Sequence, residues 1–127
     1  MSEEFRLSSI GQIALTARDL PRATEFYGRV LGLPKLLEAP GLAFFDAGGV
    51  RLMLSLPDRP EFDHPSSILY FKVPDIQAAA AALRARGVVF EEEPRLIARL
   101  PDHDLWIGAF RDSEGNLVAL MSEVRPV

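Results

Sequence analysis

Two histidines are the only side chains in this 127-residue sequence that ordinarily exchange protons near neutral pH. His64 lies in a proline-rich stretch, whereas His103 lies between Asp102 and Asp104. The Asp-His-Asp run has donor types that suit a metal ion. However, adjacent residues of one loop rarely point at a common centre, and the preceding Pro101 favours a turn. We therefore treat His103 as a candidate acid–base residue and predict no metal site in this run.

Several other chemistries have little support in the sequence. The absence of cysteine excludes disulfides, thiolate metal sites and a cysteine nucleophile. No Gly-x-Ser-x-Gly elbow occurs, and the Gly48-Gly49 pair is more typical of a hairpin turn than of a phosphate loop. The acidic run at residues 91–93 is more typical of a solvated strand edge than of a cation site.

Aromatic side chains remain as candidates for ligand contacts. Trp106 is the only tryptophan and follows His103 by three positions, and Tyr70 lies on a predicted strand. These two rings could stack on a planar or apolar ligand while His103, Gln12 or Arg51 binds a polar end. The favoured alternative for Trp106 is that it fills the core between the two halves of the chain.

The elements that must position these residues occur twice. Residues 12–23 and 68–79 each read as a strand that runs into an aspartate, Asp19 or Asp75, and then into a helix. Residues 46–54 and 112–120 each read as a glycine-containing turn that leads into a closing strand. The paired motifs, in the same order, indicate a duplicated unit.

Each half is predicted to contain a strand, a helix and three further strands. The helices are expected to end at Gly32 and Gly87. The predicted strands are residues 10–17, 35–38, 42–46 and 50–56 in the first half, and residues 88–97, 105–111 and 116–121 after the second helix. The predicted organisation is one domain, 1–127, with module one at 8–57, a proline-rich linker at 58–66 and module two at 67–123.

Strand alternation divides the predicted strands into two faces. One set is uniformly apolar and is expected to face the helices: Ile13, Leu15, Leu52, Leu54, Leu56, Leu69, Phe71, Val73, Val118 and Leu120. The other set mixes polar and apolar side chains: Gln12, Ala14, Thr16, Arg51, Met53, Ser55, Ile68, Tyr70, Lys72, Leu117, Ala119 and Met121. A mixed face suits a ligand cleft, with a solvated surface or a dimer contact as the alternatives.

The sequence resembles a known superfamily at the start of module one and at the end of module two. Residues 12–33 resemble the opening motif of the vicinal oxygen chelate superfamily, which comprises glyoxalases, bleomycin resistance proteins and dioxygenases, and residues 112–120 resemble its closing strand. The resemblance implies an α+β fold of two βαβββ modules, whose curved mixed sheets form a cleft. It also implies a homodimer, and in some members a second chain completes the cleft.

In metal-dependent members of this superfamily, four cleft positions hold the ion. Matched residue by residue, these positions are Gln12, Met53, Ile68 and Ala119. An amide oxygen can bind a divalent cation, but a thioether, a branched alkyl group and a methyl group do not complete an oxygen or nitrogen ligand set. We therefore predict no metal and no cofactor, and we disfavour metal-dependent glyoxalase or dioxygenase activity.

The preferred function is metal-free binding of a small molecule in the cleft. The predicted ligand-binding residues are Gln12, Arg51, Met53, Ile68, Tyr70, Trp106 and Ala119. The alternative is a lyase or isomerase of glyoxalase descent that uses His103 or Tyr70 in acid–base chemistry. A subunit or regulatory domain is a third option.

The composition of the chain argues against two classes of partner, nucleic acid and membranes. The net charge of −4 gives no basic footprint for nucleic acid or an anionic membrane. No apolar run approaches the roughly 20 residues of a membrane span, and residues 1–4 do not resemble the start of a signal peptide. These features predict a cytoplasmic protein with a small-molecule partner.

Overall fold

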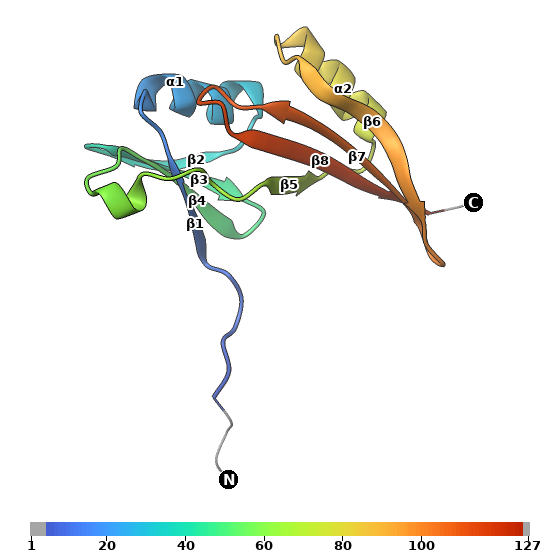
Figure 1. The fold of residues 1–127 in the computed structure, drawn as a ribbon, viewed down its shortest axis with the longest axis horizontal. Helices are drawn as coiled ribbons and strands as arrows, with labels where there is room; N and C mark the ends of the chain where they lie inside the picture. Colours follow the sequence, from blue (N-terminus) through green and yellow to red (C-terminus); the bar gives the residue numbers. More distant parts are fainter. Residues whose placement is uncertain (1–4, 126–127) are drawn as a thin grey trace.

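The computed structural model describes residues 5–125 as two four-stranded sheets, each accompanied by a helix (Figure 1). The first half contains β1 (Gln12–Thr16), α1 (Leu20–Glu25), the π-helical turn η1 (Phe26–Val30), β2 (Lys35–Ala39), β3 (Leu42–Ala47) and β4 (Val50–Ser55). A short 3₁₀ helix, η2 (Pro60–Phe62), interrupts the linker. The second half contains β5 (Leu69–Lys72), α2 (Ile76–Ala85), β6 (Phe90–Arg99), β7 (Asp104–Arg111) and β8 (Leu117–Val124).

The two sheets share one topology, as the duplicated motifs predict. The strand order is β1-β4-β3-β2 in the first sheet and β5-β8-β7-β6 in the second. The opening and closing strands of each half pair in parallel, and the remaining neighbours are antiparallel. A parallel pair requires a crossover, which each half supplies through its helix and two intervening strands. The predicted α+β fold with mixed sheets is confirmed.

The helices begin and end at the predicted signals. The Asp19 carboxylate accepts a hydrogen bond from the Arg22 backbone N–H at 3.1 Å, and Asp75 accepts one from the Ala78 N–H at the same distance. Gly32, which follows the first helix, adopts a φ of +79°, a left-handed value that favours glycine. Within the described residues, no helix has the length and apolar character that a membrane crossing demands.

The first helix differs from the prediction in its second half. Residues Phe26–Val30 form a π-helical turn, in which the Leu31 N–H donates to the Phe26 carbonyl at 2.9 Å. This wider turn keeps both Tyr27 and Val30 buried. Periodicity in the sequence does not distinguish this segment from an α-helix, because a single π-helical turn is too short to change the apolar pattern of the whole segment.

The core consists of two apolar clusters joined by the first helical segment. One cluster lies between α1 and the first sheet, and the other between α2 and the second sheet. Phe26 and Leu31 pack against both clusters, and the rings of Phe26 and Phe110 are 6.4 Å apart. Core packing therefore occupies much of the helix-facing side of each sheet.

Most of the strand residues predicted to face the helices do so. Leu15, Leu52, Leu54, Val118 and Leu120 are all buried in the two clusters. Leu56 is an exception, with 45% of its surface exposed, because β4 ends at Ser55 and Leu56 belongs to the start of the linker.

Trp106 lies on the helix-facing side of the second sheet, opposite to the mixed face that carries Tyr70. It pairs with Ser122 in β8, whereas Ala119 and Met121 point to the other face of the same sheet. Trp106 packs against the core cluster beneath α2 and borders Ile76. Trp106 is thus partly buried against the core of the second module, as the favoured alternative expects in part, and it also lines a pocket beside α2. Its contact with a ligand stays a prediction.

Polar contacts reinforce the junction between the halves. The buried Tyr27 hydroxyl donates to an Asp112 Oδ2 at 2.6 Å. Asp112, at the end of β7, also accepts hydrogen bonds from Glu114 and Asn116, which shape the β7–β8 turn. Glu114 in turn accepts hydrogen bonds from the Asp19 N–H and from Arg22 Nε at 3.0 to 3.1 Å. These bonds fix the turn against the start of α1.

Replacing Tyr27 with Phe tests how much the Tyr27–Asp112 hydrogen bond contributes to stability. Y27F removes the donor to a buried carboxylate, so we expect the free energy of unfolding in urea to fall by about 2 kcal/mol. Y70F is the matched control, because Tyr70 is 52% exposed and should have little effect. Equal stabilities of the two variants would contradict the role of the Tyr27–Asp112 bond.

The same pair gives a pH test. Burial, followed by the charge of Asp112, raises the pKa of Tyr27 above its usual value. The native chain therefore keeps the phenol proton where the unfolded chain loses it, and stability should fall as pH rises above about 10. That part of the alkaline loss should be absent from Y27F.

Candidate functional site

The side of the first sheet that faces away from α1 carries the mixed residues. We call this side the outer face of the first sheet. Register places Ala14 opposite Met53, Gln12 opposite Arg51, and Thr16 opposite Ser55 on β1 and β4. Leu42 and Phe44 of β3 continue the same face.

A pocket of about 330 Å³ lies on this outer face. Its sheet side is formed by β1, β3, β4 and the residue that follows β4, and the linker encloses the remainder. The lining residues are Ala14, Leu15, Thr16, Leu42, Met53, Ser55 and Leu56 from the sheet side, with Asp58, Phe62, His64 and Ser66 from the linker. Most of this surface is apolar, with a few hydroxyl, carboxylate and imidazole groups, which is the usual composition of a small-molecule site.

The linker is held in place at the end of β1. The Thr16 hydroxyl donates to the Phe62 carbonyl at 2.8 Å, and Arg18 donates to Asp63 at 2.6 Å. The Arg59 guanidinium also lies over the Phe62 ring, 5.7 Å from its centroid. The predicted proline-rich linker therefore forms a wall of the pocket.

Three predicted ligand-binding residues lie together beside this pocket. Arg51 Nε donates to Gln12 Oε1 at 2.8 Å, and Gln12 Nε2 approaches the Met53 sulfur at 3.7 Å. The Arg51 guanidinium also lies 5.0 Å from the centroid of the Phe44 ring. Of these residues, Met53 alone lines the pocket itself.

The other predicted residues lie on the outer face of the second sheet. Tyr70 is opposite Ala119 in the β5–β8 register, and Ile68 immediately precedes β5. Ile68 and Tyr70 are exposed, but Ala119 is only 2% exposed. Ala119 therefore lies on the predicted face without offering contact surface in this chain, because neighbouring side chains cover its methyl group.

The four positions that hold a metal in related proteins thus form two pairs, one on each sheet. Gln12 and Met53 are adjacent on the first sheet, and Ile68 and Ala119 are close on the second. Within residues 5–125, no hydrogen bond or ion pair joins the outer face of one sheet to that of the other. Convergence of all four positions on one centre stays a prediction.

These residues do not suit a metal ion. Gln12 has the only conventional donor oxygen among the four, and that oxygen already accepts a hydrogen bond from Arg51. A divalent cation there would also lie beside the positive guanidinium, which repels it. Elsewhere in residues 5–125, no group of three or more His, Asp or Glu side chains is arranged to hold a metal.

His103 lies in a separate polar cluster at one end of the second sheet. Its Nδ1 is 2.8 Å from Asp102 Oδ1, and its Nε2 is 3.7 Å from Glu123 Oε2. Lys72 Nζ lies 2.8 Å from the other oxygen of Glu123. The hydrogen bond to His103 lowers the pKa of Asp102, and the hydrogen bond and charge of Lys72 lower that of Glu123. Two ionised carboxylates therefore orient an imidazole that is 16% exposed.

Sequence reasoning missed the residues that the linker contributes. Asp58, Phe62 and His64 line the pocket, although the linker shows no periodicity that would predict a shared face for them. The one usable signal is the density of prolines between residues 57 and 65, which favours a short, stiff connection over a mobile one.

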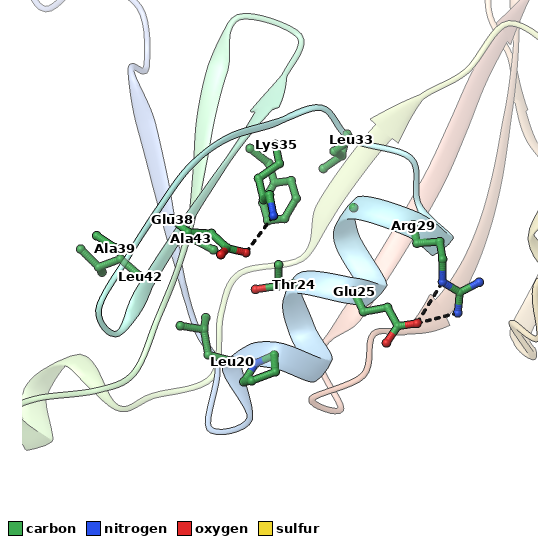
Figure 2. A pocket seen from close by; sticks show the side chains of 13 residues that line it. Leu20, Thr24, Glu25, Arg29, Leu33, Lys35, Glu38, Ala39, Leu42 and Ala43 are labelled. Carbon is green, nitrogen blue, oxygen red and sulfur yellow. Dashed lines mark hydrogen bonds and ion pairs between the residues drawn. The ribbon is translucent and has the colours of Figure 1, made fainter.

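A second cavity, of about 720 Å³, lies on the opposite side of the first sheet (Figure 2). It forms because the helix packs on β3 and β4 and leaves the edge strand β2 exposed. Its charged groups pair with one another, Lys35 with Glu38 and Arg29 with Glu25, both at 2.9 Å. None of the predicted site residues lines this cavity.

Comparison with known proteins agrees with the fold. Solved structures that resemble the chain include an integron cassette protein from the mobile metagenome of V. cholerae (TM-score 0.78, 23% identity, covering 94% of this chain and 98% of that one). An antibiotic binding protein from a Streptomyces species has a TM-score of 0.72 and 24% identity, covering 94% of this chain and 99% of that one. These two likenesses show a shared fold.

A lactoylglutathione lyase from Agrobacterium tumefaciens is similar at 27% identity, with a TM-score of 0.73, covering 91% of this chain and 94% of that one. A comparison with curated protein sequences found no match. Residues 9–120 match the Glyoxalase/Bleomycin resistance protein/Dioxygenase superfamily, which is most of the chain. In each module the closing strand pairs in parallel with the opening strand, as this fold requires. The chain belongs to this superfamily.

Proposed function

We propose that this protein binds a small organic molecule, without a metal ion, against the outer face of the first sheet. The observation that carries the proposal is the 330 Å³ pocket, which combines an apolar floor at Met53 with polar groups from the linker. Its volume falls within the range of roughly 300–1,000 Å³ that small-molecule sites occupy. The antibiotic binding protein among the similar structures supports this class of function.

Metal-independent binding is the form of this function that the residues favour. The superfamily's glyoxalase and dioxygenase chemistry polarises a substrate oxygen on an ion. Here Met53, Ile68 and Ala119 replace donors, and Arg51 occupies the oxygen of Gln12. A binding protein requires complementary surface alone, and Met53 and Ile68 can supply part of it.

A homodimer is part of the proposal. The outer face of the second sheet leaves Ile68 and Tyr70 exposed, at 44% and 52%. A second chain that placed this face over the pocket of its partner would bury both side chains and close the cleft. Apolar exposed surface of this kind is typical of association sites. The absence of cysteine favours a cytoplasmic location for such a dimer.

The enzymatic alternative rests on one specific observation, the orientation of His103 by Asp102 and Glu123. An imidazole fixed between two carboxylates could take a proton from a bound substrate, as in a lyase or isomerase. This function predicts turnover of a ligand that stabilises the protein. The rate should fall by about 10²-fold or more in H103A, the contribution typical of a general acid or base. Ligand binding without turnover would exclude it.

Addition of metal ions tests the metal-free proposal. Excess Zn²⁺, Ni²⁺, Mn²⁺ or Fe²⁺ should leave the melting temperature within about 1 °C of its starting value, and elemental analysis should find no stoichiometric metal. A specific site at a hundredfold excess over its Kd would add about 2.7 kcal/mol of stability. Such a gain, lost in Q12A, would contradict the proposal.

Filling the pocket tests the location of binding. A14F places a ring on an exposed position of β1 that lines the pocket, so ligands found in a fragment screen should bind about tenfold more weakly or not at all. The protein contains three methionines, and NMR of ¹³C-methyl methionine should show Met53 responding to these ligands. If a second chain forms the other wall, the Met121 methyl should respond as well. Retained affinity in a folded A14F protein would exclude this pocket.

A further inference from the structure

We infer that the ligand of this pocket carries a hydrogen-bond-donating cationic group on an apolar body, and that Asp58 and His64 of the linker receive that group. The inference rests on the proposed function and deepens it by naming the chemical class of the ligand. It follows from the hydrogen-bonding capacity of each polar group in the pocket.

Asp58 provides an unpaired negative charge. It lines the pocket, and its carboxylate forms no hydrogen bond or ion pair within residues 5–125. The neighbouring carboxylate in the linker, Asp63, is already paired with Arg18 at 2.6 Å and does not line this pocket. Asp58 is therefore the acidic group of the linker that remains available to a ligand here.

His64 adds a second acceptor. Its Nδ1 lies 3.0 Å from the Pro65 carbonyl oxygen. Because a carbonyl oxygen can only accept, Nδ1 carries the hydrogen of this bond. In the neutral ring Nε2 then has a free lone pair, and this nitrogen accepts a hydrogen bond from a ligand.

The hydroxyl groups in the pocket are compatible with the same ligand. Thr16 donates its proton to the Phe62 carbonyl at 2.8 Å, so its oxygen is left as an acceptor. Ser55 and Ser66 can either donate or accept. The pocket is lined by no lysine or arginine, so an anionic ligand would meet Asp58 without a compensating cation.

Arg51 is the one nearby cation on the outer face of the first sheet that could attract an anion instead. It does not line the pocket. Its Nε donates to Gln12, and its guanidinium lies over the Phe44 ring. Arg51 is therefore already engaged, whereas Asp58 and His64 Nε2 are not.

The remaining walls specify an apolar body. Met53 and Leu42 form the sheet side, and Leu56 and Phe62 flank the linker side. Phe62 is 54% exposed although its backbone is anchored by Thr16, and the Arg59 guanidinium lies over the ring, 5.7 Å from its centroid. A flat ligand in the pocket would contact the other face of this ring. An aromatic or aliphatic body with an ammonium, amidinium or guanidinium group fits this arrangement.

A matched ligand series tests the inference. Tryptamine, indole and indole-3-acetate share one ring system but are cationic, neutral and anionic at pH 7.5. Binding is measured by titration of the ¹³C-methyl signal of Met53, with M121L used to assign the signals. We expect tryptamine to bind about tenfold more tightly than indole-3-acetate, with indole between them, which corresponds to one favourable and one unfavourable charge contact.

Two variants that each remove one negative charge test whether the preference for a cationic ligand depends on Asp58. D58N should weaken tryptamine binding about fivefold and leave indole binding unchanged. E61Q removes a carboxylate from the same linker that does not line the pocket, and it should have no such effect. H64F keeps a planar ring but removes the acceptor, and it should weaken tryptamine binding by a smaller factor.

The outcomes separate the inference from the proposed function. If indole-3-acetate binds as tightly as tryptamine, or if D58N and E61Q behave alike, the ligand class is wrong while small-molecule binding in the pocket stands. If no member of the series, nor any fragment, shifts the Met53 signal, both the inference and the proposed function are overturned. A preference for tryptamine that is lost in D58N and kept in E61Q supports the inference.

Discussion

The position of the first helical segment between two apolar cores constrains the rest of the molecule. Phe26 and Leu31 contact both clusters, and the Tyr27–Asp112 bond joins the segment to the second sheet. Because this packing uses much of the inner side of each sheet, the proposed ligand and partner surfaces lie on the outer faces. Site and fold are therefore coupled: the bonds that stabilise the junction also determine which side chains meet solvent.

Much of this arrangement could be predicted from local sequence signals. Asp19, Asp75, Gly32 and Gly87 mark helix ends through backbone chemistry that acts within a few residues. The repeat of these signals predicted the duplicated topology, and the family resemblance agreed with it. Such signals hold because the cap and the turn depend on neighbours in sequence, not on the distant parts of the fold.

The sequence was not informative where contacts between distant residues decide the structure. Trp106 and Phe110 lie on the same side of β7, and the pairing of Trp106 with Ser122 shows that this side faces α2. No local signal in the linker predicted that Thr16 and Arg18 hold it against β1. Neither contact has a local signature, because each joins residues that are far apart in sequence.

In the proposed pocket, strand residues and linker residues have different roles, because core packing restricts them to different degrees. Strand residues such as Ala14 and Met53 are restricted by neighbours on both sides of the sheet, so they supply shape and apolar surface. The linker has fewer neighbours, and it can carry groups such as Asp58 and His64 without a cost to the core. In the proposed pocket the sheet therefore supplies the shape, and the charge preference resides on the segment that core packing constrains least.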